Sequence, residues 1–113
     1  MVDNAERREF PRVRVKWPVS VVTGNATIQA ETRNITVNGI FILSKDLLRL
    51  NETLLLHISP PNRQPIDVTG TLVRSDHQEF DARNISYGMG ICFIKVSDED
   101  RHFLEDVISA HPR

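Results

Sequence analysis

The sequence lacks the features that mark secreted, disulfide-stabilised and membrane-spanning proteins. Its only cysteine, Cys92, cannot form an intrachain disulfide. Because Cys92 lies in the apolar run Ile91–Ile94, we predict a buried thiol, which fits a reducing compartment. The N-terminus has no apolar signal segment, and no apolar run is long enough to cross a membrane. We therefore expect a cytoplasmic protein without membrane insertion.

The sequence also lacks an excess of charge of either sign, because the net charge is -1. This near-neutrality argues against a general binder of nucleic-acid polymers, which is usually basic overall or along one face. The cations are concentrated in Arg7–Lys16, and an acidic segment, Asp98–Asp106, balances them. A local cationic segment on a near-neutral chain of 113 residues, the length of a single domain, suits a small anion.

Signals for catalysis are missing as well. The four histidines are scattered without the spacing of metal ligands, and they are His57, His77, His102 and His111. No nucleophile motif and no glycine-rich phosphate loop is present. We therefore predict no catalytic residue, no metal site and no cofactor, and we expect that the protein is not an enzyme.

What the sequence does contain is a series of short apolar segments separated by turn residues. The predicted strands are Val13–Val22, Thr27–Ile35, Ile40–Leu43, Thr53–Ile58, Ile66–Arg74 and Tyr87–Ile94. Pro18 has no N–H to donate, so the first strand should lie at an edge or a bulge, and Gly70 predicts a bulge in the fifth strand. The polar segment Ser75–Ala82 is predicted to be a long connection.

The end of the chain has a helical pattern instead. Ser97 is a suitable N-cap, acidic residues follow it, and apolar residues recur at helical spacing over Asp98–Ser109. We expect Phe103 and Leu104 to anchor this helix to the sheet. The predicted fold class is all-β with one C-terminal helix, a small six-stranded antiparallel barrel.

The expected organisation of the single domain, residues 1–113, has three parts. Residues 1–12 form a flexible N-terminal arm that carries arginines, residues 13–96 form the barrel and residues 97–109 form the helix. Within the arm, Arg8 and Arg12 lie at most about 13–14 Å apart when the chain is extended. Pro11 disfavours a helix there. The two guanidinium groups could grip one anionic ligand, although a solvated arm with surface ion pairs would look the same in sequence.

A second polar pattern occurs in Asn34-Ile35-Thr36-Val37-Asn38-Gly39. In a strand, Asn34 and Thr36 point to the same face, where one offers an amide and the other a hydroxyl. Gly39 permits a turn with positive φ and the close approach of a ligand. On its own, the pattern also fits an ordinary polar strand end with a hairpin turn.

Together the two patterns resemble the PilZ domain family, a bacterial receptor module for cyclic di-GMP. The family pattern is Arg-x-x-x-Arg followed by Asp/Asn-x-Ser-x-x-Gly. Arg8-Glu9-Phe10-Pro11-Arg12 fills the first motif, and Asn34–Gly39 fills the second with Thr in place of Ser. The segment Tyr87-Gly88-Met89-Gly90-Ile91-Cys92-Phe93 and the helix start Asp98-Glu99-Asp100-Arg101 are also similar to the family. The resemblance covers nearly the whole chain.

The resemblance implies a role for each matching residue. Arg8 and Arg12 would bind phosphate and the Hoogsteen edge of guanine, and Asn34 would hydrogen-bond the edge of a guanine. Thr36 would supply a hydroxyl beside it, and Gly39 would keep the wall of the site low.

The resemblance also bears on stoichiometry and output. Arg7 adds a third guanidinium group, which in the family often accompanies a stacked pair of ligand molecules. The signal would pass to an unknown protein partner.

Two other functions stay open at this point. One is a PilZ-like protein-interaction adaptor that does not bind nucleotide, although such variants usually lose the arginines. The other is a small barrel for single-stranded nucleic acid, which needs aromatic stacking platforms. Trp17, Tyr87 and the five phenylalanines mostly fall in apolar phases and are interpreted as core.

Overall fold

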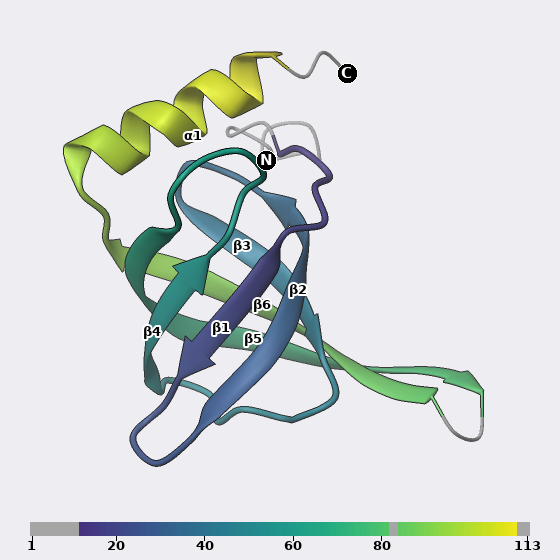
Figure 1. The fold of residues 1–113 in the computed structure, drawn as a ribbon. Helices are drawn as coiled ribbons and strands as arrows, with labels where there is room; N and C mark the ends of the chain where they lie inside the picture. Colours follow the sequence, from purple (N-terminus) through teal and green to yellow (C-terminus); the bar gives the residue numbers. More distant parts are fainter. Residues whose placement is uncertain (1–11, 82–83, 111–113) are drawn as a thin grey trace, which may run out of the picture.

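In the computed structural model, which describes residues 12–81 and 84–110, six antiparallel strands close into a barrel. The strands are β1 (Pro18–Val22), β2 (Thr27–Ile35), β3 (Gly39–Ser44), β4 (Thr53–Ile58), β5 (Ile66–Asp81) and β6 (Asn84–Lys95), followed by the helix α1 (Asp98–Ala110). Around the barrel the order is β1-β2-β3-β6-β5-β4. Figure 1 shows the barrel with α1 across one end of it. The predicted fold class is confirmed.

The first strand is shorter than predicted. Thr27–Ile35 and Thr53–Ile58 have the predicted bounds, but the predicted strand Val13–Val22 is wrong over its first five positions. The regular ladder begins only at Pro18, and upstream of it Val13 forms an isolated bridge. The alternation of apolar residues had indicated a strand because these side chains do alternate in burial, even though the backbone leaves the ladder.

The connection predicted at Ser75–Ala82 is also wrong, because β5 continues to Asp81 and pairs with β6 as far as Asn84. Figure 1 shows this hairpin extending well beyond the body of the barrel. The backbone N–H and C=O groups of the two strands hydrogen-bond to each other, so the hairpin can form without burying apolar side chains. The predicted bulge at Gly70 is confirmed by a shift of register between Thr69 and Gly70.

The core consists of the side chains that point into the barrel from alternate positions of each strand. In β4, for example, Leu54 and Leu56 are fully buried whereas Leu55 is 52% exposed. The same alternation corrects one prediction, because Cys92 is exposed. It follows the buried Ile91 in β6 and therefore points outward.

Side chains of α1 pack against the barrel as expected. Ser97 caps the helix, since its Oγ accepts a hydrogen bond of 3.1 Å from the backbone N–H of Asp100. Leu104 is fully buried, and the Phe103 ring stacks on Trp17 with 6.1 Å between ring centroids. In the described part of the chain, no helix is both long and apolar enough to cross a membrane.

Candidate ligand-binding surface

An isolated antiparallel bridge attaches the end of the arginine segment to the end of β2. The backbone N–H of Val13 donates to the carbonyl of Ile35, and the N–H of Ile35 donates to the carbonyl of Val13, both at 2.9 Å. Both side chains are buried, so their neighbours in sequence point out of the barrel. Continued by one residue, the register sets Arg12 opposite Thr36. The second arginine of Arg-x-x-x-Arg thus lies beside Asn-x-Thr-x-x-Gly.

The same register sets Arg14 opposite Asn34 on the outer surface. Arg14 is exposed and Asn34 is half-buried. The amide of Asn34 makes no hydrogen bond to any residue that the structure describes. Within the described residues, its donor and acceptor are therefore both unused.

A buried threonine fixes the path of the chain between the bridge and β1. The Thr32 side chain is fully buried, and its Oγ1 donates to the carbonyl of Val15 at 2.6 Å. The same oxygen accepts from the N–H of Trp17 at 2.8 Å, and the N–H of Thr32 donates to the carbonyl of Trp17 at 2.9 Å. These bonds hold the segment against β2, so Arg12 and Arg14 project from a fixed backbone.

Four exposed cations gather around this end of β2, namely Arg12, Arg14, Lys16 and Arg33. Arg33 joins them because the register of β2 shifts between Thr32 and Asn34, which makes Arg33 the extra residue of a bulge. Among the residues that the structure describes, none of the four forms a salt bridge with a carboxylate. No described carboxylate therefore competes with an anion for these charges.

Thr36 organises the turn that follows β2. Its Oγ1 accepts hydrogen bonds from the N–H groups of Asn38 (3.0 Å) and Gly39 (3.1 Å) and donates to the carbonyl of Gly39 at 3.3 Å. The N–H of Thr36 also donates to that carbonyl at 2.9 Å. One donor and two lone pairs complete the capacity of a hydroxyl, so the turn itself uses the group that the sequence assigned to the ligand.

Gly39 has a structural reason to be glycine that differs from the expected one. Its φ is not positive, so the expectation of a left-handed turn is wrong. Gly39 instead pairs with Cys92 of β6, and a Cβ on Gly39 would lie 2.4 Å from the carbonyl oxygen of Ile91. The glycine therefore allows β3 and β6 to approach each other at the edge of the candidate surface.

The remaining predicted site residues, Arg7 and Arg8, lie outside the described residues. Conversely, the sequence interpretation missed Arg14 and Arg33. Arg14 falls on the solvent side of the alternating pattern, which was a usable signal. Its position opposite Asn34 depends on the Val13–Ile35 register, which no local pattern reveals.

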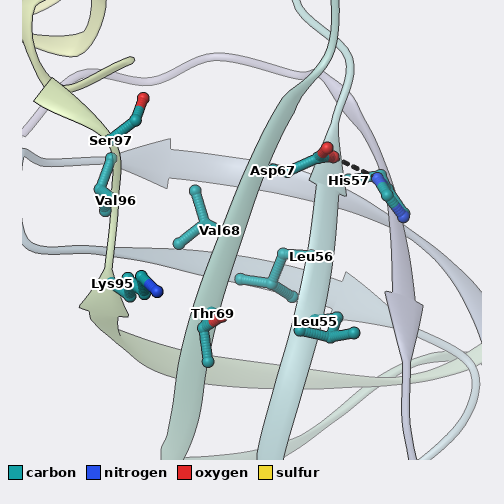
Figure 2. Close-up of a pocket in the computed structure, with 9 residues that line it drawn as sticks. All are labelled: Leu55, Leu56, His57, Asp67, Val68, Thr69, Lys95, Val96 and Ser97. Atoms are coloured by element: carbon teal, nitrogen blue, oxygen red, sulfur yellow. Dashed lines mark hydrogen bonds and ion pairs between the residues drawn. The ribbon is translucent and has the colours of Figure 1, made fainter. Parts of the chain in front are cut away.

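The structure also has a hollow on another part of the barrel, shown in Figure 2. It lies where the connection from β6 to α1 passes β5, and it is lined mainly by apolar groups such as Leu55 and Val68. Within the hollow, His57 Nδ1 contacts Asp67 Oδ1, and Lys95 also lines it. Neither here nor elsewhere in the described residues do three or more His, Cys, Asp or Glu side chains form a metal site.

Comparison with known families identifies this architecture. A model of the PilZ domain matches residues 6–110, so the chain belongs to the PilZ domain family. This is a family of ligand receptors and adaptors. A search of curated proteins found no significant match.

Solved structures agree on the fold at low sequence identity. The inhibitor of motility MotI/DgrA of Bacillus subtilis superposes with a TM-score of 0.78 at 19% identity, covering 92% of this chain and 50% of its own. The PilZ domain of YcgR from Escherichia coli with c-di-GMP gives 0.76 at 14% identity, covering 92% and 90%. The MrkH–c-di-GMP complex of K. pneumonia gives 0.72 at 14%, covering 91% and 51%. The chain thus spans about half the length of MotI/DgrA and MrkH.

Proposed function

We propose that this PilZ domain is a receptor for cyclic di-GMP, which binds on the outer surface around the end of β2. The observation that supports the proposal is the Val13–Ile35 bridge, because its register sets Arg12 beside the Asn34–Gly39 motif. The solved structures of YcgR and MrkH with c-di-GMP support the choice of ligand. The exposed cations around Asn34 have no carboxylate partner among the described residues, and they suit the two negative charges of the ligand.

Each motif residue has a proposed role. Arg8 and Arg12 bind phosphate oxygens and the O6/N7 edge of guanine, for which the planar fork of arginine is suited. Asn34 hydrogen-bonds the edge of a guanine. Thr36 lies beside the ligand while its hydroxyl stabilises the turn. Gly39 has no side chain that would obstruct the ligand.

We further propose that residues 1–12 close over the bound ligand. Fixing a backbone costs about 1–2 kcal/mol per residue, and each hydrogen bond to a charged group returns about 1.5–3 kcal/mol. Several simultaneous contacts are therefore needed, and Arg7 provides one more, which favours a stacked pair of ligand molecules. Closure changes the exposed surface, and a cytoplasmic protein partner recognises the changed surface.

The test is calorimetric titration of the purified protein with cyclic di-GMP, with GTP and, separately, with a single-stranded oligonucleotide. We expect saturable binding of cyclic di-GMP alone, with a stoichiometry near two ligands per protein for a stacked pair. Absence of binding to cyclic di-GMP would overturn the proposal and leave the nucleotide-free adaptor as the function of this domain. Binding of the oligonucleotide alone would favour a nucleic-acid role.

A further inference from the structure

The closed barrel has a short stretch where a strand is paired on one side only. β5 pairs with β4 from its first residue, Ile66, but its pairing with β6 begins only at Thr69 and Lys95. β6 ends at Lys95, and the chain then turns away toward α1. Among the described residues, positions 66–68 of β5 therefore form an open sheet edge in an otherwise closed barrel.

This open edge borders the hollow of Figure 2. The hollow has a volume of about 420 Å³ and lies between β5, with Val68, and the connection to α1, with Val96 and Ser97. Successive residues of a strand direct their backbone N–H and C=O groups to alternate sides. At least one of residues 66–68 therefore directs these groups toward the hollow. Backbone groups at a sheet edge are a template for the pairing of another strand.

Two large apolar side chains remain exposed at the hollow. Leu55 of β4 lines it and is 52% exposed, and Ile94, which precedes Lys95 in β6, is 60% exposed. Ile94 is the extra residue of a bulge, because the register of β6 against β5 shifts there. An apolar side chain that entered the hollow would remove part of this exposed apolar surface from water, together with its own.

Lys95 supplies the hollow with a cation. Lys95 is exposed, and none of the described carboxylates forms a salt bridge with it. The acidic residue of the lining, Asp67, contacts His57 Nδ1, and Figure 2 shows this pair on the other side of the hollow from Lys95. A carboxylate of a partner could therefore form a charge-assisted hydrogen bond with Lys95.

The size of this surface suits a short segment better than a second folded copy of the chain. Three strands are about 10 Å across, and residues 67–69, which line the hollow, extend about 10 Å along β5. A stable interface between folded proteins buries about 800 Å² on each partner, several times this footprint. An extended segment of a few residues would cover the hollow and also pair with the open edge.

The hollow lies away from the candidate ligand-binding surface. Around the closed barrel, β5 is three strands from β2 in either direction, so the hollow and the cationic end of β2 are on opposite sides. A segment bound in the hollow would leave the cationic surface uncovered.

We propose that the hollow and the open edge of β5 bind an extended acidic and apolar segment of a protein partner by strand addition. The backbone of the segment pairs with residues 66–68, an apolar side chain enters the hollow and a carboxylate binds Lys95. The proposal goes beyond the receptor function, because this attachment site holds the partner with or without cyclic di-GMP.

The test is a titration of the isotope-labelled full chain, followed by nuclear magnetic resonance of its backbone amides. The probe is a pool of short synthetic peptides that contain only Asp and Leu, in every order. We expect saturable shifts of the amide signals of residues 66–68, with affinities within about twofold in the presence of cyclic di-GMP. A pool of Lys and Leu and a pool of Asp and Ser should each bind at least about tenfold more weakly.

Lys95→Glu should weaken binding of the Asp and Leu pool at least about tenfold and should strengthen binding of the Lys and Leu pool. Lys45→Glu is the matched control, because Lys45 is exposed and lies outside the hollow, and it should leave both affinities unchanged. Thermal unfolding checks that each variant is folded.

The outcomes separate the two proposals. If cyclic di-GMP binds but the Asp and Leu pool leaves the signals of residues 66–68 unshifted, the attachment site is wrong and the receptor function stands. If the pool binds and cyclic di-GMP does not, the attachment site stands alone. Shifts of these signals with protein concentration, without peptide, would indicate that a second copy occupies the hollow, and the proposal would be wrong.

Discussion

The cationic end of β2 and the hollow beside His57 differ in how their charged groups are satisfied. At the end of β2, Arg12 and Arg14 are exposed without a carboxylate partner among the described residues. In the hollow, His57 is already paired with Asp67 and apolar groups form most of the lining. The charged and titratable groups of the hollow are Lys95 and the His57–Asp67 pair, whereas four exposed cations lie around the end of β2.

For a twice-negative ligand, this difference favours the end of β2. The attraction of neighbouring cations for an anion adds up when they lie within the screening length of about 8 Å at physiological salt. Arg12 and Arg14 are two residues apart and project from the same face. The hollow offers a single lysine, Lys95, in a mainly apolar lining, so a ligand there would lose its hydration with less compensation. The exposed cations, and not the shape of the surface, are therefore our reason for proposing an anion site at the end of β2.

The largest expected effect concerns the backbone that underlies the cationic surface. Gly39→Ala should lower the free energy of unfolding by about 2–3 kcal/mol, since the new Cβ meets the carbonyl oxygen of Ile91 at 2.4 Å and the strands must separate. Gly24→Ala is the matched control, because nothing lies within 4 Å of its Cβ, and it should change stability by less than about 1 kcal/mol. Urea denaturation measures both. Equal stability of the two variants would contradict the structural role of Gly39.

The next effect tests the cations themselves. Arg12→Ala, and separately Arg8→Ala, should weaken binding of cyclic di-GMP at least about tenfold, because each removes charge-assisted hydrogen bonds. Arg12→Lys should recover only part of the loss, as a point charge cannot pair in two places at once. Calorimetry provides the affinities. Wild-type affinity in both alanine variants would contradict the assignment of this surface.

Asn34 should contribute less than an arginine because its hydrogen bonds involve no formal charge on the protein side. Asn34→Ala should weaken binding about fivefold, the value of a neutral hydrogen bond of about 1 kcal/mol. The exposed Gln29 lies on the same strand toward its other end, and Gln29→Ala is the control for loss of an amide there. A loss equal to that of Arg12→Ala would indicate that Asn34 positions the chain as well as the ligand.

The barrel was predictable because its strands alternate in apolarity, and two of them, Thr27–Ile35 and Thr53–Ile58, have the predicted bounds. The protruding hairpin was not predictable in this way, since Ser75–Asp81 pairs through backbone groups that carry no side-chain signature. Cys92 was misassigned for a related reason. A run of apolar residues hides which of them face outward, and only the register shows it.

The candidate surface was predictable from its motifs but not in its geometry. The spacing of arginines and the Asn34–Gly39 pattern indicated the family, which the family comparison confirms. That Arg14 lies opposite Asn34 depends on a contact between distant segments. For Thr36 the sequence suggested a hydrogen bond to the ligand, but the hydroxyl already accepts hydrogen bonds from the backbone of the local turn.

We expect the smallest effects from substitutions in the hollow, and these test whether the ligand binds at the end of β2 or in the hollow. His57→Ala removes one side of the exposed contact between His57 and Asp67, whose side chains are 51% and 73% exposed. Because solvent-exposed pairs contribute about 0–1 kcal/mol, stability should change by less than about 1 kcal/mol, and affinity for cyclic di-GMP should stay at the wild-type value. Asp67→Asn, which keeps the shape of the side chain, should behave in the same way. If either variant lost nearly as much affinity as Arg12→Ala, the ligand would bind in the hollow and not on the cationic surface. A pair that contributes so little to stability could affect binding only through direct contact with the ligand.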